Sequence, residues 1–182
     1  MDGAIFYTSK YGSTRDYANW IAEATGLGVF DIKGNIPELE TFDFLVLGSP
    51  VFYGKLRIAK WMRSHSEAIS SKPTLLFTVS GTAEGAKLDG TTPTGLPQQM
   101  IEHIHHVGLR GRQSPRQLKW FDRMVLKLMA RATPDKQAAR EAKQGFDHVD
   151  KASIQPAVEL ITTWQATDDA ASPAATSADL RA

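Results

Sequence analysis

The sequence predicts an α/β protein built on an open, parallel, five-stranded sheet with helices on both faces. Short apolar runs recur along the chain, and stretches with helical periodicity separate them. Strands that alternate with helices form right-handed βαβ units and hence a parallel sheet. The runs are apolar at almost every position, which is typical of strands covered by helices on both faces.

The first half of the chain carries the clearest elements. Residues 4–7 form an apolar run that a polar, glycine-containing loop ends, which predicts a buried strand. From Ser13 onward apolar residues recur at helical spacing, and Gly26 is expected to stop this helix. Ser13 or Thr14 is expected to cap it. The other elements expected in this half are strands at 29–32, 44–47 and 74–79, the second of them stopped by Gly48-Ser49-Pro50, and a helix at 56–69.

The second half is less regular, and its loop at 81–97 is rich in Gly, Thr and Pro. The expected elements are a helix at 98–106, a weak fifth strand at 106–112, an amphipathic helix at 118–132 and a closing helix at 153–165 capped by Ser153. Residues 166–182 consist largely of Ala, Ser, Thr and Asp, which predicts a disordered tail. We therefore expect one domain, 1–165, followed by the tail, 166–182.

Composition and charge limit the chemistry. The 182 residues include no cysteine, which excludes a thiol nucleophile, a disulfide framework and a cysteine-ligated metal cluster. Redox chemistry would then depend on a bound organic cofactor or a non-thiolate metal. The net charge is +1, but ten Lys and Arg against three Asp and Glu give residues 110–143 a charge of +7. This asymmetry predicts an anionic partner near one part of the surface.

Other classes of partner are not expected. No zinc-finger, helix-turn-helix or RNP pattern occurs, and the basic region is one helix rather than a broad field, so a nucleic-acid partner is not expected. Among the histidines of residues 102–106, only His103 and His106 have i, i+3 spacing, and no third ligand is evident, so no metal is expected. The N-terminus lacks the features of a signal peptide, and no stretch approaches the ~20 apolar residues of a spanning helix. We expect a cytoplasmic protein, in solution or peripheral on the cytoplasmic face of a membrane.

A polar loop at 8–14 connects the first strand with the first helix. A helix start offers unpaired N–H groups and a positive dipole end, hydroxyls add donors, and Gly12 lets the backbone come close, which predicts a phosphate cradle. The loop is neither a Walker A nor a dinucleotide fingerprint, so a monophosphate is favoured. An ordinary capped turn is the alternative. The candidate residues are Thr8, Ser9, Lys10, Tyr11, Gly12, Ser13 and Thr14.

Two further loops follow the third and fourth strands. In an open sheet, ligands bind beyond the carboxyl ends of the strands where the strand order reverses, which for the order 2-1-3-4-5 lies between strands one and three. A ligand with a phosphate at one end and a flat ring at the other would fit the loop at 8–14 and the loop at 48–54 together, and the loop after the fourth strand could supply a third wall. The alternative is that Phe52 and Tyr53 are core residues at the start of a helix. The candidate residues are Pro50, Val51, Phe52, Tyr53, Gly54, Ser80, Gly81, Thr82 and Ala83.

Residues 8–14 resemble the FMN-phosphate loop of flavodoxins, whose usual form is Ser/Thr-x-Ser/Thr-Gly-x-Ser/Thr. Tyr11 departs from that form, and the variant is similar to the SKYGST loops of flavodoxin-like oxidoreductases. Residues 48–54 resemble the second flavin loop of the family. The resemblance covers residues 4–164 and implies a flavodoxin-like sheet of order 2-1-3-4-5 that binds FMN. It implies that the first loop holds the phosphate, and that residues 50–54 and 80–83 hold the isoalloxazine ring.

The helix expected at 118–132 resembles that of one particular group of flavodoxin-like proteins. At 100° per residue, five cations form one stripe that also contains Trp120, and apolar residues lie opposite. Residues 118–124, with Leu128 and Met129, are similar to the corresponding helix of flavodoxin-type, quinone-dependent protoporphyrinogen IX dehydrogenases. The cations are Arg116, Lys119, Arg123, Lys127 and Arg131. The resemblance implies an oxidoreductase of porphyrin biosynthesis that oxidises protoporphyrinogen IX, or a related reduced substrate, with a quinone as electron acceptor.

Several interpretations stay open. The helix at 116–132 suits an anionic small-molecule substrate or an anionic membrane surface, or is an ordinary solvated face. The alternative function is an electron-transfer carrier that docks to a redox partner protein and catalyses nothing itself. By resemblance such carriers are acidic, which the basic segment does not match. A phosphate-accepting signalling domain would need an aspartate where Gly48-Ser49-Pro50 stands. No acid–base dyad is evident, so no catalytic residue is assigned.

Overall fold

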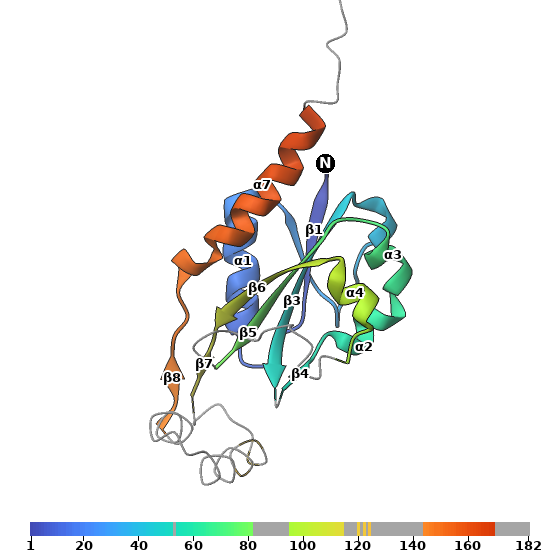
Figure 1. Ribbon diagram of the computed structural model, residues 1–182. Helices are drawn as coiled ribbons and strands as arrows, with labels where there is room; N and C mark the ends of the chain where they lie inside the picture. Colours follow the sequence, from blue (N-terminus) through green and yellow to red (C-terminus); the bar gives the residue numbers. More distant parts are fainter. Residues whose placement is uncertain are drawn as a thin grey trace, which may run out of the picture.

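The computed structural model describes residues 1–52, 54–81, 95–114, 120, 122, 124 and 144–169. Its main sheet has five parallel strands in the order β2-β1-β3-β5-β6, and the short strand β4 pairs antiparallel with β3. Apart from β4, this is the expected order 2-1-3-4-5, so the predicted fold class is confirmed. Helices α1 and α7 lie on one face of the sheet, and α2, α3 and α4 lie on the other (Figure 1).

The bounds of the elements are as follows. The strands of the main sheet are β1 (Gly3–Tyr7), β2 (Gly28–Asp31), β3 (Phe44–Phe52), β4 (Lys55–Leu56), β5 (Thr74–Ser80) and β6 (Ile104–Arg110). The helices are α1 (Ser13–Thr25), α2 (Ala59–Ser64), α3 (Ser66–Ser70), α4 (Gln98–Glu102) and α7 (Gln155–Asp169), with 3-10 turns η1 (Leu39–Thr41) and η2 (Lys151–Ile154). A second, two-stranded sheet pairs β7 (Arg112–Gln113) with β8 (Phe146–Asp147).

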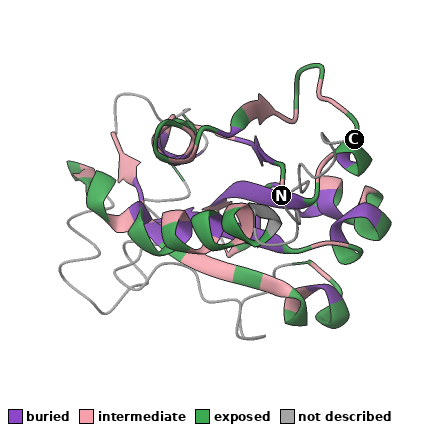
Figure 2. Ribbon diagram, turned by 90° about the horizontal axis from the view of Figure 1, so that it is seen from above, coloured by how far each residue is buried: buried purple, intermediate pink, exposed green. Residues whose placement is uncertain are grey.

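The central strands supply two hydrophobic cores, one on each face. In β1, Ile5 and Tyr7 belong to the core under α1 and α7, whereas Ala4 and Phe6 belong to the core under α2, α3 and α4. This alternation follows from the two-residue period of a strand. Figure 2 shows the central strands buried between helices whose outer faces are exposed. The sheet is therefore a rigid base for the loops at its carboxyl edge.

Strand β3 extends beyond the point where the sequence predicts that it stops. Residues 48–50 continue in parallel register with residues 77–79 of β5. A β-carbon at Gly48 would lie 2.3 Å from Cζ of Phe77, so glycine leaves the space that this ring fills. The prediction that Gly48-Ser49-Pro50 ends the strand is wrong, because the glycine is a packing residue here and not a turn residue.

The helix expected at 56–69 is interrupted. Residues 55–56 pair with residues 51–52 as β4, so the helix begins only at Ala59. It breaks at His65, whose φ of −118° and ψ of 27° lie outside the helical region. The helix expected at 98–106 is also shorter and ends at Glu102, because residues 104–110 pair with residues 74–80 of β5.

Two predicted caps are wrong. Helix α1 begins at Ser13, but its N-cap is Gly12. The closing helical segment is capped by Asp150, whose side chain accepts a hydrogen bond from the Ala152 N–H at 2.9 Å, and not by Ser153. A carboxylate two residues before the N–H competes well for this role. The helix that follows, α7, extends to Asp169, past the expected domain boundary.

Part of the expected structure lies outside the described residues. This holds for residues 82–94, for the tail at 170–182, and for most of the helix expected at 118–132, of which Trp120, Asp122 and Met124 are helical. Within the described ranges, no helix combines the length and the apolar character that crossing a bilayer requires.

His106 is expected to make the stability of the sheet depend on pH. Its Nε2 lies 2.8 Å from Oγ1 of Thr78, and burial lowers the pKa of the His106 imidazole below its ordinary value of 6.5. The unfolded chain therefore takes up the proton more readily. The free energy of unfolding should fall as the pH drops through about 6.5 and should level off below the lowered pKa.

The measurement is urea unfolding of wild type and His106→Asn between about pH 8 and pH 5. The variant should show a smaller fall in stability than wild type over this range. His103→Asn serves as a control because His103 is exposed. Equal pH slopes for wild type and His106→Asn would contradict the prediction.

Candidate cofactor-binding site

The first candidate loop leaves β1 beside Gly48 of β3, and β3 continues to Phe52 before the turn of the second candidate loop. Tyr7, the last residue of β1, is in register with Gly48 of β3, and the Thr8 N–H donates to the Gly48 carbonyl at 3.0 Å. The strand order β2-β1-β3 changes direction between these two strands. Both loops therefore lie at the topological switch point of the sheet, the usual ligand-binding position of such folds.

The first loop forms a cradle at the start of α1. Thr8, Ser13 and Thr14 are all buried, with Thr14 only 1% exposed. Gly12 has a φ of 96°, which favours glycine, and its N–H donates to Oγ of Ser9 at 3.1 Å. Within the described part of the chain no side chain caps the start of α1. The first N–H groups of a helix then suit an anion, and the buried hydroxyls add donors.

Cations border this cradle. Nζ of Lys33 donates to the Ser9 carbonyl at 3.3 Å, and the Arg15 side chain lies near Gly12. Burial, and to a smaller extent the Asp31 carboxylate, raise the pKa of the Tyr7 phenol, while Arg15 lowers it. The phenol therefore stays protonated at neutral pH. Lys33 and Arg15 therefore bring positive charge to the border of the loop, as a phosphate site requires.

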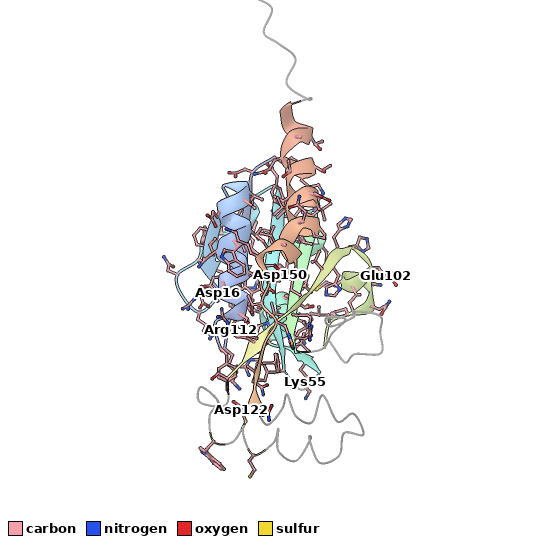
Figure 3. The ribbon with its side chains drawn as sticks, turned by 90° about the vertical axis from the view of Figure 1, so that its left-hand side faces the viewer. Asp16, Lys55, Glu102, Arg112, Asp122 and Asp150 are labelled. Carbon is pink, nitrogen blue, oxygen red and sulfur yellow. The ribbon has the colours of Figure 1, made fainter. Side chains whose placement is uncertain are left out.

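A third segment closes the cradle from the side of β5. Oγ of Ser13 accepts a hydrogen bond from the Arg112 N–H at 3.1 Å, and the Gly111 N–H donates to the Ser80 carbonyl at 2.7 Å. Arg112 also pairs with the Asp16 carboxylate of α1, and Figure 3 shows these two side chains next to each other. The start of α1, the end of β5 and strand β7 are thereby fixed to one another.

The second loop is a tight hairpin. Residues 51–52 pair with residues 55–56, and Gly54 has a φ of 73° in the turn between them. Oγ of Ser49 accepts a hydrogen bond from the Ile58 N–H at 3.2 Å, which ties the hairpin to the chain that follows it. The Phe52 ring lies 5.6 Å from the Tyr11 ring, centroid to centroid. An aromatic group of the second loop therefore contacts the first loop directly.

The structure also brings in a residue that sequence reasoning missed. Asp122 is only 4% exposed, and its Oδ2 accepts hydrogen bonds from Nζ of Lys10 at 2.7 Å and from the Tyr11 hydroxyl at 2.5 Å. Nζ of Lys10 also lies 4.4 Å from the centroid of the Phe52 ring. The sequence holds one signal for this role, because Asp122 is an acid within a basic run and lies on the opposite side of the predicted helix from Trp120.

The structure brings together residues 8–14 of the first loop, residues 50–52 and 54 of the second, and Ser80 and Gly81 of the third. A β-carbon at Gly81 would lie 2.6 Å from Cζ of Phe146, so the two-stranded sheet packs against the third loop. Tyr53, Thr82 and Ala83 lie outside the described residues.

His103 and His106, the two candidate metal ligands, have polar contacts with other groups of the chain. Nδ1 of His103 lies 2.7 Å from the Gln99 carbonyl, and Nε2 of His106 contacts Thr78. Within the described ranges, no three His, Cys, Asp or Glu side chains form a group able to hold a metal ion.

Fold and site together define a class of protein: an open α/β domain with an anion cradle after its first strand and an aromatic loop after its third. The chain belongs to the flavodoxin domain family, whose model matches residues 4–139. A comparison with curated protein sequences found no match.

Among solved structures, the chain is similar to three flavodoxins. One is from the domain Archaea, with 14% identity, a TM-score of 0.44, and coverage of 89% of this chain and 99% of that chain. Another is the oxidised flavodoxin 2 of Bacillus cereus, with 18% identity, a TM-score of 0.45, and coverage of 79% and 93%. A third is the Fusobacterium nucleatum flavodoxin bound to flavin mononucleotide, with 18% identity, a TM-score of 0.39, and coverage of 62% and 71%.

FMN is the cofactor of this flavodoxin domain, as its sequence predicts. The residues present fit its phosphate. The start of α1 has no side-chain cap among the described residues, three buried hydroxyl residues surround it, and Gly12 adopts the conformation that opens the loop. Such a helix start is a ready site for a phosphate monoester.

Proposed function

We propose that the protein is an FMN-dependent oxidoreductase that oxidises protoporphyrinogen IX, or a related reduced anionic substrate, and passes the electrons to a quinone. The observation that carries this proposal is the attachment of the basic segment to the cofactor loop through Asp122, Lys10 and Tyr11. Residues 110–143 carry a charge of +7 in the sequence, and positive charge near a flavin site suits a substrate that carries carboxylates. The choice of substrate and acceptor is supported by the resemblance of residues 118–124 to quinone-dependent protoporphyrinogen dehydrogenases.

The reaction balances without a further reagent. In each cycle the reduced substrate loses two electrons and two protons, and the quinone takes up the same number to become a quinol. Bound FMN supplies the two-electron chemistry. The residues of the chain hold the cofactor: the loop at 8–14 binds the phosphate, and the segments at 50–54 and 80–83 enclose the ring. We assign no general acid or base, because the flavin carries the chemistry.

The first experiment is the visible absorption spectrum of the purified protein, with chromatography of the cofactor released by heat. Bands near ~375 and ~450 nm and released FMN are expected for a flavoprotein. The FMN-loaded protein is then mixed anaerobically with protoporphyrinogen IX and a soluble quinone. Protoporphyrin fluorescence should appear only when protein and quinone are both present. A flavoprotein that gives no porphyrin above the protein-free control would contradict the proposed activity.

The second candidate is an electron-transfer carrier, which the flavodoxin fold supports equally well. A carrier would exchange electrons with a redox partner protein and would not oxidise the porphyrinogen. The same anaerobic assay separates the two, because a carrier reduced by dithionite would reduce cytochrome c while porphyrin formation stays at background.

A membrane-bound quinone would require contact with a bilayer, and we propose that the exposed face around Trp120 and Met124 makes it. These side chains are 74% and 52% exposed. Trp120 shares the predicted basic stripe, and basic side chains near anionic lipid each contribute about 1 kcal/mol. Aromatic and apolar groups add to such binding by entering the headgroup region.

Trp120→Ser with Met124→Ser is expected to lower the binding of the protein to phosphatidylglycerol vesicles by about tenfold, since two apolar side chains are lost. Vesicle sedimentation measures this, with pure phosphatidylcholine vesicles as the uncharged control. The control variant is Thr162→Ala with Thr163→Ala, two exposed residues on α7. Another tryptophan, Trp20, does not serve as the control because it packs against the core. Equal binding of wild type and the double variant would rule out this face as the membrane contact.

A further inference from the structure

Asp122 is a buried carboxylate that accepts hydrogen bonds from two residues of the cofactor loop. Its side chain is 6% exposed, and Lys10, the cation that pairs with it, is 21% exposed. The two donors, Nζ of Lys10 and the Tyr11 hydroxyl, reach the same oxygen, Oδ2. A buried charge persists only when it is paired and hydrogen-bonded, so these contacts hold Asp122 and the loop together.

The direction of Asp122 follows from its neighbours. Residues 120, 122 and 124 are helical. At about 100° per residue, Asp122 points about 200° away from Trp120, and Met124 lies near Trp120. The burial values agree, because Asp122 is 4% exposed while the other two are exposed. The helix therefore presents Asp122 to the cofactor loop and its apolar pair to the outside.

We propose that Asp122 is a positioning residue of the FMN-phosphate loop. Its carboxylate holds Lys10 and also Tyr11, the residue at which the loop departs from the usual flavodoxin form. It thereby fixes the loop in the shape that receives the phosphate. The inference rests on FMN binding at residues 8–14 and not on the identity of the oxidised substrate. It also gives Lys10 and Tyr11 a role other than direct contact with the cofactor.

The arrangement around Lys10 supports this role. Nζ of Lys10 lies between the Asp122 carboxylate at 2.7 Å and the face of the Phe52 ring at 4.4 Å. The Tyr11 ring packs against the Phe52 ring. Asp122 thus orders a contact between the first and second loops. The positive charge of Lys10 compensates the negative charge of Asp122, which lies near the proposed site of the dianionic phosphate. Without the carboxylate, Lys10 and Tyr11 would lose the acceptor that fixes both side chains.

The test is the affinity of apo-protein for FMN and for riboflavin, measured by quenching of flavin fluorescence. Asp122→Asn should raise the Kd for FMN by about tenfold or more, because it leaves Lys10 half-buried without its charge partner. The Kd for riboflavin, which lacks the phosphate, should change much less. Glu159→Gln removes one exposed charge on α7 and should leave both affinities unchanged.

The outcomes separate the explanations. A tighter Kd for FMN in Asp122→Asn would mean that Asp122 competes with the phosphate for Lys10, and would overturn the proposal. An unchanged Kd, or an equal loss for FMN and riboflavin, would also overturn it. A wild-type protein that binds no FMN would defeat both the inference and the flavoprotein assignment. Failure of porphyrinogen turnover alone would leave the inference intact.

If Asp122→Asn folds poorly, two further variants test the same contacts. Tyr11→Phe retains the ring against Phe52 and removes the hydroxyl that donates to Asp122, and it should weaken FMN binding several-fold without changing riboflavin binding. Lys10→Met combined with Asp122→Asn removes both charges. The double variant should bind FMN more tightly than either single variant, because the uncompensated charge is gone. Additive losses in the double variant would contradict the pairing.

Discussion

Gly48→Ala is expected to lower the free energy of unfolding by as much as about 3 kcal/mol, the upper end of the usual cost of overpacking a core. The added β-carbon would lie 2.3 Å from Cζ and 2.9 Å from Cε1 and Cε2 of Phe77. Phe77 is fully buried in the core under α1 and α7 and lies on the neighbouring strand. A ring held on all sides cannot move away cheaply, so the backbone of β3 has to shift instead. Urea unfolding measures the loss.

Two glycines serve as matched controls for this substitution. Gly34→Ala lies in an exposed turn, where the nearest atom to the new β-carbon is the Asp31 carbonyl oxygen at 3.5 Å, and it should be nearly neutral. Gly54→Ala meets nothing within 4 Å but has a φ of 73°, so it should cost only about 1 kcal/mol of backbone strain. A Gly48→Ala protein as stable as the Gly34→Ala protein would show that the sheet tolerates the ring moving.

The same glycine shows why the sequence predicts the order of elements better than their ends. Apolar runs covered on both faces identify β1, β3 and β5, because burial leaves few polar positions in them. Gly48 and Pro50 are turn residues in isolation. Their place within β3 depends on Phe77, which lies far away in the sequence and contacts Gly48 only through strand pairing. Local signals cannot report such a contact.

In the candidate site too, the sequence predicts the contiguous loop but not its contacts with distant residues. The loop at 8–14 could be predicted because its hydroxyls, its glycine and the helix that follows are contiguous. Its contact with Asp122 joins residues more than one hundred positions apart, and sequence periodicity gives only the face of the helix on which Asp122 lies. Arg112 likewise reaches Ser13 and Asp16 through the path of β6 and β7, which no local pattern reveals.

Ser9→Ala combined with Thr14→Ala is expected to raise the Kd for FMN by about a hundredfold, since two hydrogen bonds to a charged group are worth about 1.5–3 kcal/mol each and part of the loss is recovered by water. Thr14 is 1% exposed at the start of α1, and Ser9 accepts the Gly12 N–H at 3.1 Å. Both residues therefore act on the phosphate cradle itself. Riboflavin affinity should change little. Fluorescence titration with both flavins measures the effect.

The exposed pair Thr41→Ala and Ser64→Ala, which lies away from the loop, is the control and should bind FMN like wild type. An FMN affinity unchanged in Ser9→Ala with Thr14→Ala would remove residues 8–14 as the phosphate site.

Adding Asp122→Asn to this double variant tests how the buried carboxylate acts. If Asp122 works by shaping the loop, its substitution has less to disturb once the hydroxyl donors are gone, so the triple variant should lose less affinity than the sum of the separate losses. Full additivity would mean that Asp122 and the hydroxyls contribute independently. The hydroxyls of the loop and the Asp122 carboxylate therefore act together only if the losses in FMN binding free energy of the two sets of substitutions are not additive.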